Sequence, residues 1–276
     1  MTVFALALAL LAAVMHAVWN LLVKSSEDQL VAGWTVVAGA GILALPVLVL
    51  TGLPDRSVWD LILISTLVQV VYVLTLAAAY RVGDLSFVYP LARGTSPVLV
   101  SLAGVAFLGD EISPIGWFGV FTVTGALTLL AWRRSDRSGL GAALATGVLI
   151  SLYTSVDAAA VREQGAALSV IAAEFVLLSI ALGLVVIFMR GPEAMLGMVR
   201  SDWRKAAVGG FATGVAYLLV MVAALTAPVG LVSGVRETSV LIAVVASRLL
   251  LHEDVTRYQL GMVAAAVAGI ALIAIG

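Results

Sequence analysis

Two arginines stand inside long apolar stretches of this sequence, and each is followed by a threonine and a serine. Arg93 begins the string Arg-Gly-Thr-Ser at 93–96, and Arg236 begins Arg-Glu-Thr-Ser at 236–239. A guanidinium that lines a water-filled cavity can bind a carboxylate, phosphate or phosphonate through two parallel hydrogen bonds. The alternative is that both side chains only snorkel to lipid headgroups. Because each arginine follows an apolar turn and has a threonine and a serine beside it, we expect a functional role for both.

Acidic residues within the apolar stretches occur in the second half of the chain, where they are Asp157, Glu174 and Glu237. We therefore expect one of these three acids to neutralise Arg236. The first half has no comparable acid, so Arg93 is expected to lack an internal partner and to bind an anionic group of a ligand.

Four of these residues are candidates for coupling or gating: Asp157, Glu174, Arg236 and Glu237. Burial favours the neutral form of a carboxyl group and a neighbouring arginine favours the charged form, so a conformational change can move a proton on or off Asp157. The alternative for Asp157 is a structural ion pair with Arg236 or Arg162. Glu174 has the further alternative of facing the membrane interface.

The remaining candidate ligand contacts are polar or aromatic side chains within the apolar stretches. His16 and Asn20 are spaced i, i+4 and share one helical face, as do Tyr153 and Asp157. Aromatic rings can wall a binding site, or can simply pack between helices. The expected ligand-binding set is Arg93, Asn20, His16, Trp19, Tyr72, Tyr153 and Tyr217.

Several kinds of chemistry are disfavoured by composition. The chain has no cysteine and two histidines, which leaves no thiolate and too few imidazoles for a metal cage. No nucleophile or zinc motif of an intramembrane enzyme is present. The net charge of −1 disfavours nucleic acid as a partner. We expect no catalytic residue, no metal and no cofactor.

The elements that must position these residues are apolar segments of membrane-spanning length. Hydrophobic residues make up 62% of the chain and charged residues 11%, and a bilayer-spanning helix needs about 20 mostly apolar residues. Ten such segments are expected, at 3–23, 29–51, 59–80, 86–108, 114–132, 139–161, 168–189, 204–226, 230–251 and 258–275. The expected fold is therefore an all-α integral membrane protein, multi-pass in the cell membrane, with its longest polar connections at 133–138 and 191–204.

The two halves of the chain repeat each other. The Arg-x-Thr-Ser strings occupy matching places in the fourth and ninth segments, and a Tyr-x-Leu pattern recurs at Tyr72 and Tyr217. We predict two five-helix repeats, at 1–132 and 139–276. Because five is odd, the second repeat enters the membrane in the opposite direction, which is the inverted topology of many secondary transporters.

These strings resemble the EamA-type permeases of the drug/metabolite transporter superfamily. The resemblance is carried by His-Ala-Val-Trp-Asn at 16–20, Tyr-Pro-Leu-Ala-Arg at 89–93, Gly-Asp-Glu at 109–111 and their echoes in the second half. It implies a central cavity between helices one, three, four, six, eight and nine. The Tyr-Pro-Leu-x-Arg and Arg-Glu-Thr-Ser strings are also similar to a subgroup found near phosphonate-utilisation genes.

Orientation and depth follow from the positions of the charges. Placing both termini outside puts one set of basic residues on the cytosolic side, namely Lys24, Arg81, Arg133, Arg134, Arg137, Arg190, Arg200, Arg204, Lys205 and Arg257. The resemblance implies that both termini lie inside the cell, but we follow the charges.

The depth of the two arginines follows from their places in the helices. At the helical rise per residue, Arg93 lies about 10 Å below one face and Arg236 about 9 Å below the other. We thus expect two separate polar groups, one under each face.

The expected function is secondary active transport, by export or exchange, of small polar metabolites that are zwitterionic or anionic, such as amino acids or organic acids. The alternative is an efflux carrier for cationic drugs that uses Asp157 or Glu174 as its acidic binding residue. A channel is disfavoured because the polar residues form clusters instead of a continuous series of rings. The expected partners are the substrate, protons and the lipid bilayer, and the expected state is a monomer or homodimer.

Overall fold

The chain folds into a bundle of α-helices, shown by a computed structural model that describes residues 1–24, 28–83, 85–132, 138–242 and 256–276. Ten α-helices of eight residues or more and one short 3-10 turn, η1 (Arg56–Val58), lie in this part. The helices are α1 (Val3–Lys24), α2 (Gln29–Thr51), α3 (Trp59–Val82), α4 (Leu85–Phe107), α5 (Pro114–Trp132), α6 (Leu140–Gln164), α7 (Leu168–Arg190), α8 (Pro192–Ala224), α9 (Val229–Arg236) and α11 (Arg257–Ile275).

The surface and interior of the bundle have the polarity expected in lipid. Seven stretches of described helix are long and apolar enough to cross a membrane by length and composition. Large apolar side chains face outward, among them Phe188, Phe107 and Leu50, which are 92%, 85% and 86% exposed. The charged residues Arg93, Asp157, Glu174, Arg236 and Glu237 are instead buried. The protein is an all-α membrane protein that exposes large apolar side chains and buries five charged ones.

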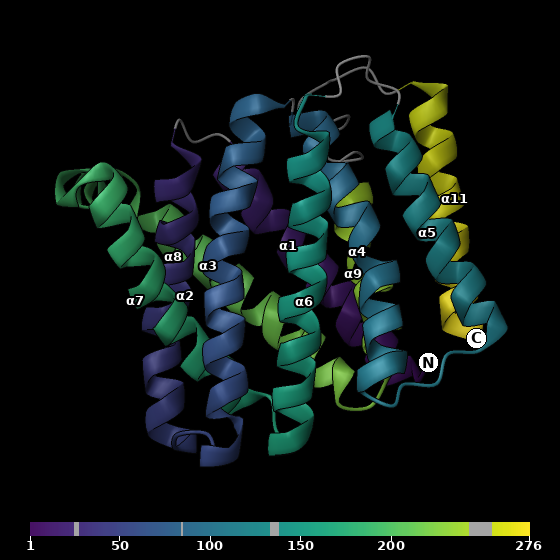
Figure 1. The fold of residues 1–276 in the computed structure, drawn as a ribbon, viewed down its shortest axis with the longest axis horizontal. Helices are drawn as coiled ribbons and strands as arrows, with labels where there is room; N and C mark the ends of the chain where they lie inside the picture. The colour runs from purple at the N-terminus through teal and green to yellow at the C-terminus, as the bar shows by residue number, and fades with distance from the viewer. Residues whose placement is uncertain (25–27, 84, 133–137, 243–255) are drawn as a thin grey trace.

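The helices pack as two equivalent sets of five. In the repeat, α6 is the counterpart of α1, and α8 is the counterpart of α3. α1 packs on α8, and in the same way α6 packs on α3. Three further pairs, α2 with α7, α4 with α9 and α5 with α11, each join a helix to its own counterpart. An approximate two-fold axis therefore relates the halves. Five crossings separate α1 from α6, so the second half is inverted, and both chain termini lie at one end of the bundle (Figure 1).

Two expected boundaries differ from the structure. The connection predicted at 191–204 is helical from Pro192 onward, because Gly191 takes a positive φ of 81° as the N-cap and Pro192 starts a run rich in good helix formers. The ninth segment is broken: α9 ends at Arg236, Glu237 lies in a turn, and helix resumes at 238–242. Residues 243–251 of that segment lie outside the described part.

Glycines allow the close helix contacts on which the bundle depends. At the crossing of α5 and α11, a Cβ added to Gly119 would lie 2.7 Å from the carbonyl oxygen of Gly269. α2 and α8 meet in the same way, since a Cβ on Gly210 would lie 2.8 Å from the Cα of Gly39. Small residues at such crossings let backbones approach where lipid supplies no hydrophobic driving force between helices.

Candidate functional site

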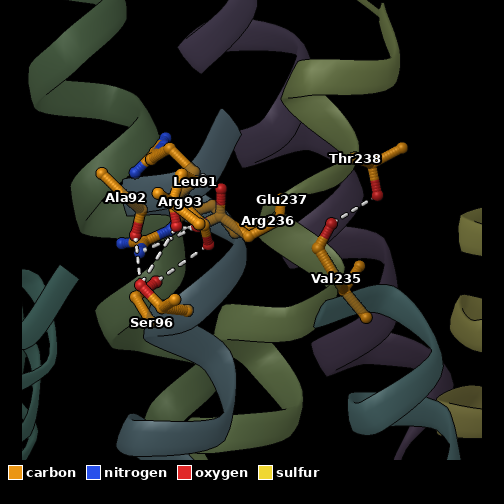
Figure 2. Close-up of polar contacts among 9 residues, drawn as sticks. Leu91, Ala92, Arg93, Ser96, Val235, Arg236, Glu237 and Thr238 are labelled. Carbon is orange, nitrogen blue, oxygen red and sulfur yellow. Dashed lines mark hydrogen bonds and ion pairs between the residues drawn. The ribbon is translucent and has the colours of Figure 1, made fainter. Parts of the chain in front are cut away.

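Three buried charged side chains meet where α4 packs on α9. Glu237 Oε2 lies 3.1 Å from Nε of Arg93, and Glu237 Oε1 lies 3.2 Å from Nη2 of Arg236. Arg93, Arg236 and Glu237 are 3%, 2% and 1% exposed. Figure 2 shows the three side chains gathered together. We call Arg93, Arg236 and Glu237 the arginine cluster.

The carboxylate of Glu237 is shared unequally between the two guanidinium groups. Arg236 donates hydrogen bonds to Oε1 of Glu237 from Nε at 3.3 Å and from Nη2 at 3.2 Å. Nε of Arg93 is close enough for an ion pair, but its N–H is not aligned for a hydrogen bond, and Nη2 of Arg93 has no hydrogen-bond partner. Two positive charges and one negative charge leave the cluster with a net charge of +1 and a buried, unused donor on Arg93.

The break in the ninth segment places Glu237 where it can reach both arginines. α9 is an eight-residue helix that begins near one face of the bundle, and Glu237 is its C-cap.

The threonine next to Arg93 is satisfied within its own helix. On α4, the hydroxyl of Thr95 donates to the carbonyls of Leu91 and Ala92. Hydroxyls that bond their own helix in this way are satisfied locally. Thr95 of the first Arg-x-Thr-Ser string is therefore bonded to its own helix, whereas Arg93 of the same string contacts Glu237.

The expectation that Arg93 lacks an internal acid is wrong, because Glu237 from the other half is its partner. The expectation for Arg236 is confirmed, with Glu237 as the acid. The two arginines were also expected in separate groups under opposite faces, and they share one cluster instead. Arg93 and Arg236 each lie about 10 to 12 Å from the first residue of their helices, α4 and α9. Their long side chains close the remaining distance across the middle of the bundle.

Aromatic side chains extend from the arginine cluster. The guanidinium carbon of Arg93 lies 5.7 Å from the ring centre of Tyr89. Tyr72 and Tyr153 interact with the charge on Arg93 and lie 5.4 Å apart, centre to centre. His16 on α1 is within electrostatic range of both arginines. Three of the expected ligand contacts, Tyr72, Tyr153 and His16, thus lie in the neighbourhood of the cluster.

A second buried group lies on the far side of these rings. The hydroxyl of Tyr217 donates to Asp157, and Ser65 donates to Glu174 at 3.0 Å. Gln69 also donates to Glu174. Asp157 and Glu174 are 1% and 2% exposed and lie near each other. We call Asp157 and Glu174 the acid pair.

The tyrosines connect the two charged groups. The ring of Tyr153 lies between those of Tyr72 and Tyr217, with a centre-to-centre distance of 6.2 Å to Tyr217. Tyr217 in turn hydrogen bonds Asp157. A cationic cluster and an acidic pair are thus joined by three aromatic rings, and this arrangement complements a small molecule that has an anionic group at one end and a cationic or neutral polar group at the other.

Arg162 does not pair with Asp157, the alternative raised for it above. It forms an ion pair with Asp110 at 2.8 Å, and its guanidinium donates to the carbonyls of Ala224, Ala227 and Leu108. Asp110 also accepts a hydrogen bond from the backbone N–H of Val229 at the start of α9. These contacts join the ends of α4, α6, α8 and α9 at the face that holds the termini, which we call the terminal face.

A simpler ion pair lies at the opposite face. Arg190 at the end of α7 and Asp28, the N-cap of α2, are 2.7 Å apart and about one-third exposed. Partial burial alone would raise the pKa of Asp28, but hydrogen bonds from Arg190 and from the backbone of Val31 and Leu30 lower it below its ordinary value. This pair joins two helices, whereas Arg162 joins four.

Some candidates fall outside what the structure describes, and others were missed. The side chains of Trp19 and Asn20 are not among those described. Tyr89 was missed, although its i−4 spacing from Arg93 is a readable signal. Ser65 and Gln69 carry no sequence signal, because polar residues in α3 become informative only once α6 and α7 pack beside them.

Ten described helices in two inverted halves, with five charged side chains buried between them, are typical of a multi-pass membrane protein of the transporter type. The chain belongs to the EamA-like transporter family, whose profile matches residues 3–132 and again residues 137–275. This family lies within the drug/metabolite transporter superfamily and is not an enzyme family.

Solved structures share the fold. One crystal structure has a TM-score of 0.78 at 16% identity, and the match covers 98% of this chain and 96% of that chain. At that identity the likeness supports the fold alone. No curated protein matches the sequence.

Proposed function

We propose that this protein is a secondary active transporter of a small anionic or zwitterionic metabolite, such as an amino acid or an organic acid. The observation that carries the proposal is the net charge of +1 in the arginine cluster, together with the buried Nη2 of Arg93 that has no hydrogen-bond partner. A charged donor left unpaired inside a membrane protein is costly, and a ligand anion would satisfy it.

The acid pair extends this proposal to the rest of the ligand and to coupling. Asp157 and Glu174 lie across the tyrosines from the arginine cluster. In that place they suit the ammonium group of a zwitterion, or a proton that moves with the cycle. Residues 1–132 and 139–276 are the two units that we expect to rock against each other around this central site.

A second candidate function is efflux of a cationic drug. The observation that favours it is the burial of two carboxyl groups side by side, with hydrogen bonds to Asp157 from Tyr217 and to Glu174 from Ser65 and Gln69. The two functions differ in which group the substrate requires. Asp157→Asn should abolish transport of a cation, whereas transport of an anion should depend on Arg93.

The test begins with a thermal-shift screen of the purified protein against amino acids, organic acids, phosphonates and cationic drugs. A labelled hit is then measured by counterflow in proteoliposomes, where only a carrier accelerates uptake when unlabelled substrate is trapped inside. We expect Arg93→Ala to abolish counterflow of an anion. Arg93→Lys should restore it poorly, because an ammonium group cannot donate two parallel hydrogen bonds to the anion as a guanidinium does.

Arg190→Ala is the matched control, since it removes an arginine that has an acidic partner at the membrane face. It should transport normally. Normal anion counterflow by a folded Arg93→Ala protein would contradict the proposal, and the acid pair would then be the place to seek the substrate site.

A further inference from the structure

We propose that Glu237 sets the charge of the ligand that the arginine cluster accepts. The site then binds a ligand group with one negative charge and rejects a group with two. This inference rests on the proposed function, because it assumes that the anion binds at Arg93. It concerns which class of anion the site selects.

The argument starts from how Glu237 divides its two oxygens. Oε1 accepts both hydrogen bonds from Arg236, so Arg236 is neutralised. Oε2 lies 3.1 Å from Nε of Arg93 but makes no hydrogen bond there. A ligand anion can therefore bind Nη2 of Arg93 without displacing Glu237 from Arg236.

The charge of the complex then decides selectivity. With Glu237 in place, a monoanion brings the cluster from +1 to zero, whereas a dianion brings it to −1. All three side chains are at most 4% exposed, so water does little to stabilise an excess charge. The cluster therefore fits a carboxylate or a phosphodiester-like group better than a phosphate or phosphonate dianion.

Replacing Glu237 with glutamine should invert this preference. Glutamine keeps an oxygen that can accept from Arg236, but the cluster now carries +2 and a dianion brings it to zero. The interaction of two unit charges about 5 Å apart, at an effective dielectric constant of about 20, changes a binding constant by roughly 250-fold. We expect the ratio of dianion to monoanion affinity to rise at least tenfold, allowing for relaxation and residual water.

Two probes of nearly the same shape isolate the charge: methylphosphonate, at a pH where it carries two charges, and its monomethyl ester, which carries one. Binding of each is measured on the purified full chain by calorimetry and thermal shift. The wild type should prefer the ester, and Glu237→Gln should prefer methylphosphonate. Glu163→Gln changes the net charge of the chain equally at an exposed position, and it should leave the ratio unchanged.

A double variant guards against misfolding of the single one. Arg236→Gln with Glu237→Gln restores a cluster charge of +1, so it should again prefer the ester. A purely structural role of Glu237 would not produce this reversal.

The outcomes separate the two proposals. An unchanged ratio in folded Glu237→Gln, with both probes lost in Arg93→Ala, overturns the role of Glu237 alone. If Arg93→Ala binds both probes as the wild type does, or if no form of the protein binds either probe, the anion site at Arg93 is itself overturned.

Discussion

The two arginines of the cluster should differ in how much stability they contribute, and truncating each to alanine measures the difference. Arg93→Ala and Arg236→Ala delete the same side chain from sites that are 3% and 2% exposed, so the cavity and transfer terms nearly cancel. What remains is the effect on charge and hydrogen bonding. Arg93→Ala leaves the neutral pair of Arg236 and Glu237, with both hydrogen bonds intact.

Arg236→Ala has a larger cost for the same reason. It removes both donors to Oε1 of Glu237 and leaves that carboxylate with Arg93, whose N–H is not aligned for a hydrogen bond. A buried charged acceptor that loses its hydrogen bonds costs about 1 to 3 kcal/mol or more, and breaking a buried ion pair costs about 3 to 5 kcal/mol. We expect Arg236→Ala to be less stable than Arg93→Ala by about 2 to 4 kcal/mol.

Unfolding of each purified variant in mixed micelles, titrated with a denaturing detergent and followed by tryptophan fluorescence, measures this difference. Thermal inactivation provides a second readout. The reasoning also predicts that Arg236→Ala with Glu237→Gln recovers much of the lost stability, because no acid is then left without donors. Equal loss of stability in the two alanine variants, or a greater loss in Arg93→Ala, would refute the unequal sharing of Glu237.

Two further predictions use the absence of native cysteine, which makes any introduced cysteine a unique probe. Arg162 joins four helix ends at the terminal face, so Arg162→Ala should expose a cysteine at Ser101, buried between α4 and α9, to a thiol reagent from that face. Arg190→Ala should leave this cysteine protected, and equal labelling in both variants would show that Arg162 does not hold these helix ends together. From the distribution of basic residues we predict that the terminal face lies outside the cell. In intact cells an impermeant reagent should therefore label Ser57→Cys and spare Ser138→Cys, and the reverse pattern would invert the orientation.

Much of the fold was predictable because a bilayer constrains the sequence locally. A helix must span a fixed thickness with its backbone satisfied internally, so apolar length alone locates most crossings. The errors arose where local composition is ambiguous. The segment after Gly191 is polar enough for a loop but contains good helix formers, and the break at Glu237 has no Gly or Pro beside it to mark it in the sequence.

The candidate site was predictable in its members and unpredictable in its pairings. An ionisable residue inside an apolar segment is expensive, so Arg93, Arg236, Glu237, Asp157 and Glu174 were identifiable from sequence. The presence of three intramembrane acids in the second half also implied that Arg236 would meet an acid of its own half. It did not imply that Glu237 would serve Arg93 as well.

The sequence by itself determined that this protein is a membrane protein of two inverted halves with charges inside it, because the cost of burying charge in lipid and the length of a crossing act on each segment separately. The tertiary structure alone decided which charges meet. Arg93 and Glu237 are far apart in the chain and come together because α4 packs on α9 at the centre of the bundle, within reach of a long side chain. Arg162 likewise meets Asp110 and not Asp157, because the ends of α4 and α6 lie at the same face.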